Sequence, residues 1–411
     1  MTPESKGPHV LIVGAGLGGL ALAQCLRKRG ISFEIFERDA DENSRPQGWA
    51  IGLHTMLDEL HNSIPSDLPN LHGNVHHLLP LKLNSQICVY FQGIDSRVGV
   101  QDTPETPCLR ADRPKFRLWL STNIPIQWNK RLTQIDESVD GNVSLKFQDG
   151  STANGDILIG ADGVQSFVRE NLIQRPNNEF LRVVPTATII GELKLSGAAF
   201  ERQLSLGHSS WIAVASDWKH RLFTGLQHVS SDGKSGDYYW FYTEHDDSVD
   251  RPDHWMRLAS LGEKLAYVRR RISSFDPELR EVVEATSADN IKDTHFLWRD
   301  AELPSLPLGR VALLGDAAHP MTPFRGEGGV HAIRDALLLA KHLSHVNIHD
   351  SQGLFQTIGE YHAEVLERGV QAVRASRGAF HGHGQGKPSI VGWGHTAVPI
   401  PEENVSLSAV C

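Results

Sequence analysis

The chain has 411 residues, of which 40% are hydrophobic and 22% are charged, and its formal net charge at pH 7 is −9. This composition is typical of a globular protein, and the length exceeds one ordinary core, so two domains or one large α/β unit are expected. The negative charge disfavours nucleic acid or an acidic membrane surface as a partner.

Cysteine and histidine usage gives no sign of a disulfide framework or a metal site. The four cysteines are Cys25, Cys88, Cys108 and Cys411, which show no close pairing and favour a reduced compartment. The 21 histidines are scattered without an HExxH or paired Cys/His spacing, so no metal is expected. No apolar run approaches the ~20 residues that span a bilayer, and residues 1–8 are polar, so we expect a cytoplasmic protein without membrane association.

The N-terminal half begins with a strand–helix–strand unit. Residues 9–30 form a buried strand, a glycine turn and an amphipathic helix, and residues 32–39 supply a second strand. Residues 110–120 are expected to be a short helix that opens with basic residues. Residues 142–163 alternate as a hairpin around a turn at 149–150 and end in a buried strand.

The predicted secondary structure changes twice in the second half. Residues 185–250 contain short, aromatic-rich strands separated by turn residues, which predict an antiparallel domain, and residues 253–286 are mainly helical. Residues 309–320 then form a strand that runs into a glycine turn, and two helices follow at 329–343 and 352–376.

This order predicts a discontinuous architecture of the α/β class. A Rossmann-like domain would carry an inserted, mainly antiparallel β domain and C-terminal helices. We assign 1–80, 105–184 and 287–376 to the Rossmann-like domain, 81–104 and 185–286 to the inserted domain, and 377–411 to an extended tail.

Gly14, Gly16 and Gly19 form a GxGxxG motif between the first strand and its helix. In a dinucleotide fold the first glycine permits a tight turn, the second lets a pyrophosphate approach the backbone, and the third lets helix and sheet pack closely. Glu37 follows at the end of the second strand, where an acid binds a ribose diol; the alternative is a surface glutamate. Arg38 either faces solvent or lies over the adenine. A glutamate here would repel a 2′-phosphate, so FAD or NAD is favoured over NADP as the bound nucleotide.

Two later segments favour FAD over NAD. Asp162-Gly163 directly follows a buried strand, and Gly315-Asp316 follows another. An NAD dehydrogenase needs neither. There is also no second GxGxxG for a separate nicotinamide domain.

The three segments together resemble the class A flavoprotein monooxygenases, the para-hydroxybenzoate hydroxylase-like group that uses FAD. They correspond to that family's GxGxxG, DG and GD motifs in the family's order. The segments "RPQGWAIGLH" and "PFRGEGGVHAIRDAL" are most similar to fungal members associated with secondary metabolism. The resemblance covers most of residues 8–376 and weakens in the middle domain. It implies that the Rossmann-like domain, with its GxGxxG motif, is the FAD-binding domain and that the inserted domain is the substrate-binding domain.

The resemblance implies roles in FAD binding for Gly14, Gly16, Gly19, Glu37, Arg38, Gly48, Ala50, Arg113, Asp162, Gly163, Asp316, Pro323, Gly326, Gly328 and Gly329. Arg113 would reach the FAD phosphate or ribityl region, unless it is a surface arginine at a helix start. Asp316 would accept a hydrogen bond from a ribityl hydroxyl. Asp162 and Gly163 would serve FAD and the transient approach of NAD(P)H.

The segment "HPMTPFRGEGGVHAIRDA", residues 319–336, enters a helix without a Ser or Asp cap. With FAD bound, its glycines would lie against the isoalloxazine ring, and the helix N-terminus would stabilise the negative charge of the reduced flavin. Family members often have Gln at the position of Glu327, whose charge would be unfavourable there unless it pairs. Arg325 is the nearest candidate partner.

The activity implied by the resemblance is hydroxylation of a small aromatic or polycyclic substrate with O2 and transiently bound NADPH or NADH, through a flavin C4a-hydroperoxide. The general base is not identified. Candidate pocket residues are Trp211, Tyr239, Trp240, Tyr242 and Arg325, although aromatic strand residues are more often core. A monomer or a homodimer is expected.

Three alternatives stay open at this point. A flavin-dependent epoxidase or Baeyer–Villiger oxygenase would have nearly the same sequence. An FAD-dependent dehydrogenase or reductase would reduce its substrate without consuming oxygen. A non-catalytic FAD-binding protein is the third, and reduction of bound FAD by NAD(P)H would argue against it.

Overall fold

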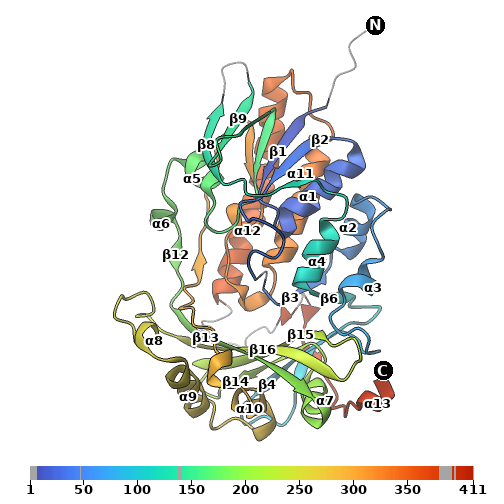
Figure 1. Ribbon diagram of the computed structural model, residues 1–411, viewed down its shortest axis with the longest axis vertical. Helices are drawn as coiled ribbons and strands as arrows, with labels where there is room; N and C mark the ends of the chain where they lie inside the picture. The colour runs from blue at the N-terminus through green and yellow to red at the C-terminus, as the bar shows by residue number, and fades with distance from the viewer. Residues whose placement is uncertain (1–6, 47, 138–140, 379–390, 393–394, 411) are drawn as a thin grey trace.

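The computed structural model describes residues 7–46, 48–137, 141–378, 391–392 and 395–410. Two parts lie one above the other along the long axis (Figure 1), the first built on a parallel sheet and the second on a larger, mostly antiparallel sheet. Within the described ranges, no helix combines the length and apolar character needed to cross a membrane.

The parallel sheet is the core of the first part. Its strands, in spatial order, are β18 (Val311–Leu313), β11 (Ile157–Gly160), β1 (His9–Val13), β2 (Ser32–Phe36) and β7 (Ile126–Gln127). All neighbouring pairs in it are parallel. Val10 to Val13 are buried, as expected for a central strand covered on both faces.

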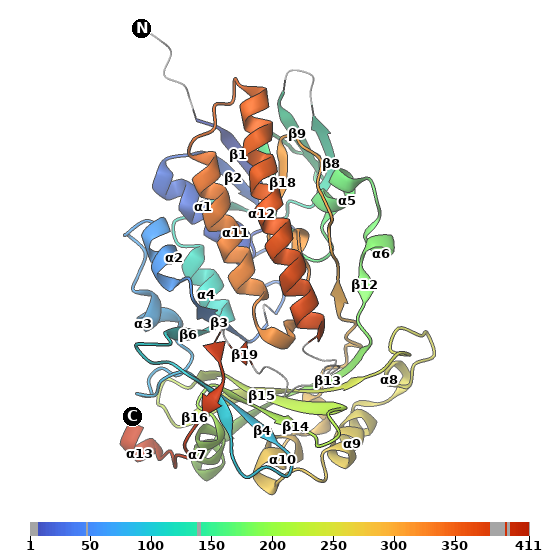
Figure 2. The same cartoon turned by 180° about the vertical axis from the view of Figure 1, so that it is seen from behind.

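The first part also contains helices and a small antiparallel sheet. The helices are α1 (Leu17–Arg29), α2 (Leu57–Ser63), α3 (Leu71–Val75), α4 (Arg113–Leu120), α5 (Phe167–Ile173), α6 (Asn177–Phe180), α11 (Gly328–Leu343) and α12 (Ser351–Gly378). The small sheet contains β8 (Leu132–Glu137), β9 (Val143–Phe147) and β10 (Thr152–Gly155). Figure 2 shows α11 and α12 side by side, and α11 points its N-terminal end toward the second part.

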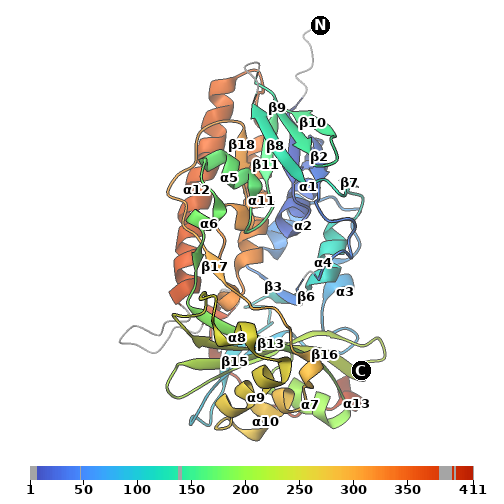
Figure 3. The same cartoon turned by 60° about the vertical axis from the view of Figure 1, so that its left-hand side comes forward.

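The second part is a seven-stranded sheet backed by helices, which we call the large sheet. Its strands, in spatial order, are β13 (Thr186–Ser196), β16 (Ser235–His245), β15 (His220–Val229), β14 (Ser210–Val214), β4 (Gln86–Phe91), β5 (Val98–Gln101) and β21 (Val398–Pro399). Only β14 and β4 pair in parallel among these described strands. The helices α7 (Gly197–Leu206), α8 (Trp255–Leu258), α9 (Leu261–Arg271) and α10 (Pro277–Glu284) belong to this part. Figure 3 shows α7, α9 and α10 on the side away from the parallel sheet, so the other face of the large sheet, its inner face, is turned toward the first part.

Two short strand pairs connect the parts. They are β3 (Ala50–His54) with β6 (Cys108–Asp112), and β12 (Arg182–Val183) with β17 (Arg299–Asp300). The expected helix over 110–120 is wrong in its first turn, because residues 108–112 belong to β6 and α4 begins at Arg113. Asp112 sets this start: its Oδ1 accepts a hydrogen bond from the Lys115 N–H at 3.1 Å, and Pro114 occupies the first turn.

Part of the expected extended tail is attached to the large sheet. β21 pairs with β5, and the buried side chain of Arg97 donates from Nε to the carbonyl of Ile400 at 3.3 Å and from Nη1 to that of Ser205 at 2.5 Å. The short strands β19 (Val391–Gly392) and β20 (His395–Thr396) and the helix α13 (Leu407–Val410) complete this end. Residues 379–390, 393–394 and 411 lie outside the described residues.

Three buried histidines predict acid sensitivity. Burial lowers the pKa of His76, His331 and His362 from 6.5 to about 4. A folded-state pKa below the unfolded value gives stability that is complete above pH 6.5 and is lost as the pH falls toward 4. Between pH 7 and pH 5 each histidine should cost about 2 kcal/mol of unfolding free energy. Urea unfolding at the two pH values measures this loss.

A single variant isolates one histidine. Neither ring nitrogen of His362 has a hydrogen-bond partner among the described residues, so His362→Leu removes the titrating group without breaking a bond. We expect this variant to lose less stability between pH 7 and pH 5 than the parent. The exposed His349→Leu should behave like the parent. An unchanged pH dependence in His362→Leu would contradict the assignment.

Candidate active site

The glycine loop between β1 and α1 borders free space at one residue. Gly14 has φ +111°, and a Cβ there would lie 2.3 Å from the carbonyl oxygen of Ala161; a Cβ on Gly19 would lie 2.0 Å from that of Gly14. By contrast, a Cβ on Gly16 would meet no atom within 4 Å. The packing of the protein itself therefore excludes side chains at Gly14 and Gly19, whereas Gly16 leaves its backbone open to a ligand.

Glu37 is not a surface residue. It is only 4% exposed. Its Oε2 accepts a hydrogen bond from the Ala15 N–H at 2.9 Å, and its Oε1 accepts one from the Asp39 N–H at 3.1 Å. These two bonds hold a carboxylate at the edge of the glycine loop. Arg38, the next residue, is exposed.

Arg113 and Asp316 present opposite charges near the glycine loop without pairing. Arg113 begins α4, and Asp316 lies in the short helix η2 (Gly315–Ala317). Neither side chain has a hydrogen bond or ion pair with any other described residue. Both are accessible to solvent, yet the surrounding protein displaces enough water to raise the pKa of Asp316 and to lower that of Arg113, with each charge opposing the shift of the other. The two side chains therefore offer polar groups that no described residue uses.

Gly48 lies against Arg113. It has φ +84°, and a Cβ there would lie 3.0 Å from Nη1 of Arg113. The predicted site residue Gly48 therefore lies next to the Arg113 guanidinium. Ala50, the other predicted residue here, begins strand β3. A larger residue at position 48 would both strain the backbone and displace this guanidinium.

Asp162 has a structural partner that the sequence did not predict. Its Oδ2 accepts hydrogen bonds from the N–H groups of Phe167 at 2.7 Å and Val168 at 3.2 Å, and its Oδ1 accepts one from the Ser166 hydroxyl at 2.5 Å. The carboxylate thus satisfies free amides at the start of α5. Gly163, with φ +80° and no atom within 4 Å of an added Cβ, keeps its backbone accessible.

The loop before α11 has the uncapped geometry predicted from its sequence. Pro323 to Arg325 form a short helix, η3, which ends at Gly326 with φ +66°. Glu327 is the N-cap residue of α11, but its side chain makes no capping hydrogen bond. Instead, Nε and Nη2 of Arg325 donate to its two carboxylate oxygens, each at 2.9 Å. The expected Arg325–Glu327 pair is confirmed.

A buried ion network connects the segment before this loop to the helices α11 and α12. Oδ2 of Asp335, on α11, accepts a hydrogen bond from the Gly315 N–H at 2.7 Å and lies 2.7 Å from Nε2 of His319. Its Oδ1 accepts one from Nη2 of Arg368, on α12, at 2.7 Å. Burial alone would raise the pKa of Asp335, but the charges of His319 and Arg368 lower it to about 2. The network therefore connects Asp316, next to Gly315, to both long helices.

Aromatic side chains gather between the inner face of the large sheet and the first part. They are Trp49, Phe223, Tyr239, Phe241, Trp298 and Phe324. The rings of Trp49 and Tyr239 stack with centroids 4.8 Å apart, and Trp49 meets Phe241 edge-on at 5.1 Å. Apart from the buried Tyr239 they are half-buried, so this cluster, the aromatic wall, offers apolar surface to a ligand.

Only one of the four aromatic candidates from the sequence belongs to this wall. Tyr239 does, and its hydroxyl accepts a hydrogen bond from Nη2 of Arg110 at 2.6 Å. Trp211, Trp240 and Tyr242 belong instead to the core cluster on the helix-covered face, which corrects their assignment as pocket candidates. Successive strand residues point to opposite faces, so Tyr239 and Trp240 cannot share one.

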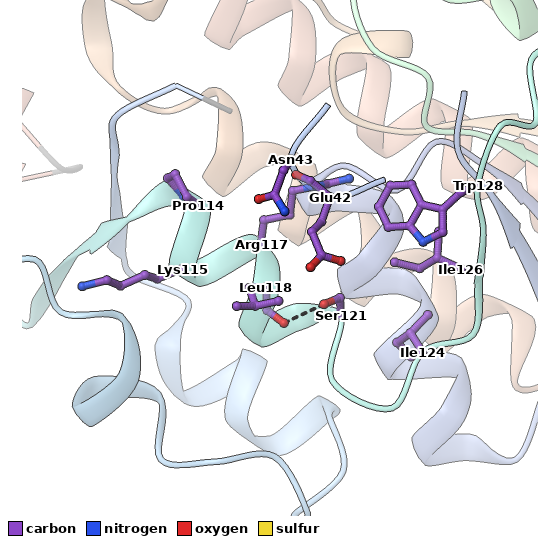
Figure 4. A pocket seen from close by; sticks show the side chains of 10 residues that line it. All are labelled: Glu42, Asn43, Pro114, Lys115, Arg117, Leu118, Ser121, Ile124, Ile126 and Trp128. Atoms are coloured by element: carbon purple, nitrogen blue, oxygen red, sulfur yellow. Dashed lines mark hydrogen bonds between the residues drawn. The ribbon is translucent and has the colours of Figure 1, made fainter. Parts of the chain in front are cut away.

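A surface pocket of about 490 Å³ lies beside the glycine loop (Figure 4). Its lining residues are Glu42, Asn43, Pro114, Lys115, Arg117, Leu118, Ser121, Ile124, Ile126 and Trp128. Arg117 forms a shared wall, because its Nε donates to the carbonyl of Ala15 at 2.9 Å while its guanidinium lies 5.4 Å from the Trp128 ring centroid. The pocket therefore borders the glycine loop without including Gly16.

The comparisons with known proteins agree with this geometry. Residues 8–62 and 120–376 match the FAD binding domain family, and the chain belongs to this family. It is 51% identical over 373 residues to the FAD-dependent monooxygenase thnD of Trichoderma harzianum, covering 90% of this chain and 92% of that protein. It is 26% identical to the 6-hydroxynicotinate 3-monooxygenase of Bordetella bronchiseptica, covering 89% and 90%. The fold matches Klebsiella pneumoniae HpxO complexed with FAD and uric acid, with a TM-score of 0.70, 20% identity and coverage of 92% and 89%.

The chain is therefore a flavoprotein with an FAD-binding domain. More particularly, it is an FAD-dependent monooxygenase, which confirms the class A resemblance drawn from its motifs.

Proposed function

We propose that this monooxygenase uses NAD(P)H and O2 to hydroxylate a small aromatic or polycyclic substrate held against the aromatic wall. The half-buried rings of Phe223, Phe241 and Trp298 on the inner side of the large sheet carry this proposal, because planar substrates stack well on such surfaces. The bacterial relative is named for hydroxynicotinate, and HpxO holds uric acid. Both compounds are planar heterocycles, which supports the same substrate class here.

The residues near the glycine loop fit FAD. Gly16 leaves space for a pyrophosphate, Arg113 offers an unpaired guanidinium to phosphate or ribityl oxygens, and Asp316 offers an unpaired carboxylate to a ribityl hydroxyl. Glu37 keeps acceptor capacity for a ribose hydroxyl beside the amides it already binds. When bound, the cofactor accepts a hydride from NAD(P)H and delivers one oxygen atom of O2 to the substrate.

The surrounding side chains position the substrate and exclude water. Nε1 of Trp49 donates to Glu192 at 2.6 Å, and Glu192 pairs with Lys292 at 2.6 Å, so the indole is held at both its ring face and its edge. Arg110 fixes the Tyr239 ring beneath it. A wall fixed in this way keeps its shape while the substrate is held, which favours insertion of oxygen over release of peroxide.

Product analysis under labelled oxygen tests the proposal. The FAD-loaded protein is mixed with planar phenols and heterocycles, NADPH or NADH, and ¹⁸O2. We expect a compound that speeds NAD(P)H oxidation to leave as a hydroxylated product carrying one ¹⁸O atom. Reduction of a compound without oxygen uptake would contradict the proposal in favour of a dehydrogenase, and ring expansion to a lactone would favour a Baeyer–Villiger oxygenase.

Phe241→Ala should weaken substrate binding without loss of FAD. Removing one ring from the aromatic wall takes away apolar contact with the substrate that is worth about 1.5 kcal/mol or more. KM should therefore rise about tenfold, and more NADPH should be consumed without product. Steady-state kinetics with the identified substrate measures both effects. Tyr238→Phe is the matched control, because Tyr238 is on the helix-covered face and its hydroxyl has no partner among the described residues. Equal KM values for Phe241→Ala and this control would contradict the wall.

A further inference from the structure

Glu327 is in the position of a helix cap but does not cap. A carboxylate at a helix N-terminus ordinarily accepts hydrogen bonds from the free amides and is stabilised by the helix dipole. Here both carboxylate oxygens bind Arg325 instead, in a two-pronged pair whose side chains are 22% and 12% exposed. The Glu327 carboxylate is therefore directed to Arg325 and not to the free amides of α11.

The turn at Gly326 makes the pair possible. Its left-handed conformation, with φ +66° and ψ 18°, reverses the chain so that Arg325 and Glu327 face each other across it. The first backbone amide of α11 to donate a hydrogen bond is that of His331, which donates to the Glu327 carbonyl at 3.0 Å. The N–H groups of residues 328–330 have no partner among the described residues.

We infer that Arg325 is a positioning residue that holds the Glu327 carboxylate away from the N-terminus of α11. Its guanidinium keeps the amides of residues 328–330 free for the flavin. It also neutralises the negative charge of Glu327 beside the flavin. This inference rests on the proposed function, which places the flavin ring at this loop. Figure 2 shows the same end of α11 pointing toward the large sheet, where the proposed substrate lies.

Loss of Arg325 would change the loop in two ways. The released carboxylate could rotate onto the three free amides, as an acidic N-cap does, and would then compete with the flavin for them. Its charge would also be uncompensated next to the place where flavin reduction adds negative charge. Arg325→Gln should therefore weaken FAD binding and lower the flavin reduction potential, and both effects should act through Glu327.

A double-mutant cycle tests this coupling. FAD titration of the apoprotein and anaerobic redox titration are compared for the parent, Arg325→Gln, Glu327→Gln and the double variant. We expect Arg325→Gln to bind FAD at least tenfold more weakly and to have a lower potential, and the double variant to return both values close to the parent. Arg334→Gln is the control, because it removes a cation from α11 that binds Thr55 rather than Glu327. A double variant as impaired as Arg325→Gln would overturn the inference.

The stability of the apoprotein separates positioning from a merely structural role. If Glu327 caps α11 once Arg325 is gone, the apoprotein of Arg325→Gln should unfold at the same temperature as the parent or at a higher one, although it binds FAD less well. A lower unfolding temperature together with weaker binding would overturn the inference in favour of a structural ion pair. If the parent protein itself does not take up FAD, the proposed function fails, whereas normal FAD uptake by Arg325→Gln refutes the positioning role alone.

Discussion

Gly16→Val should give a folded protein that has lost its FAD. The residue has φ −79° and ψ −175°, a conformation that valine adopts readily, and no protein atom lies within 4 Å of an added Cβ. The valine side chain would instead fill the space proposed for the pyrophosphate. We expect FAD affinity to fall by at least a hundredfold, which corresponds to about 2.8 kcal/mol. Titration of the apoprotein with FAD, followed by fluorescence, measures the change.

Valine substitutions at two other glycines serve as controls for this result. Gly7→Val, at an exposed residue with no neighbour within 4 Å of its Cβ, should keep both stability and FAD affinity. Gly19→Val should fail to fold, because its side chain would collide with the carbonyl of Gly14 at 2.0 Å. If Gly16→Val bound FAD as tightly as the parent, the pyrophosphate would not lie at this glycine.

Asp335→Ala should strongly destabilise the protein. The carboxylate is fully buried and compensates both His319 and Arg368. Removing one member of a buried ion network leaves uncompensated charge and typically costs about 3–5 kcal/mol. The urea midpoint should fall accordingly at pH 7, with FAD affinity also reduced because the Gly315 amide loses its acceptor.

The same network predicts a dependence on alkaline pH. Burial alone would lower the pKa of His319, but the adjacent Asp335 raises it above 6.5. A raised folded-state pKa gives stability that is present below pH 6.5 and is lost as the pH rises through that pKa. Asp335→Ala should abolish this loss. Glu364→Ala, which removes the half-exposed partner of Arg368, is the control and should cost no more than about 1 kcal/mol. Equal destabilisation by the two variants would contradict the network.

The geometry of the glycine loop could be predicted from the sequence because its signals are local. A strand, a glycine turn and a helix follow one another over residues 9–30, so the spacing of Gly14, Gly16 and Gly19 already specifies which glycine packs and which stays open. The Arg325–Glu327 pair spans two residues and could be predicted in the same way. The start of α4 was misplaced because Asp112 both ends a strand and caps the helix.

The aromatic wall could not be predicted because the contacts that form it are not local. Residues 238–242 are five consecutive aromatic residues, so the hydrophobic pattern does not show which side chains face the helices. Pairing with β13 and packing on α9 and α10 decide this, and they put Tyr239 and Phe241 on the inner face. Trp49 was also missed, although both of its neighbours, Gly48 and Ala50, were expected at the flavin. Its stacking on Tyr239 depends on the contact between the two parts.

A crystal structure of the protein with FAD bound tests the account most directly. It should show the pyrophosphate at the Gly16 amide, a ribityl hydroxyl on the Asp316 carboxylate, and the flavin ring between the N-terminus of α11 and the aromatic wall. FAD bound with its ring turned away from Phe241, or with Gly16 and Asp316 out of contact, would contradict the proposed site.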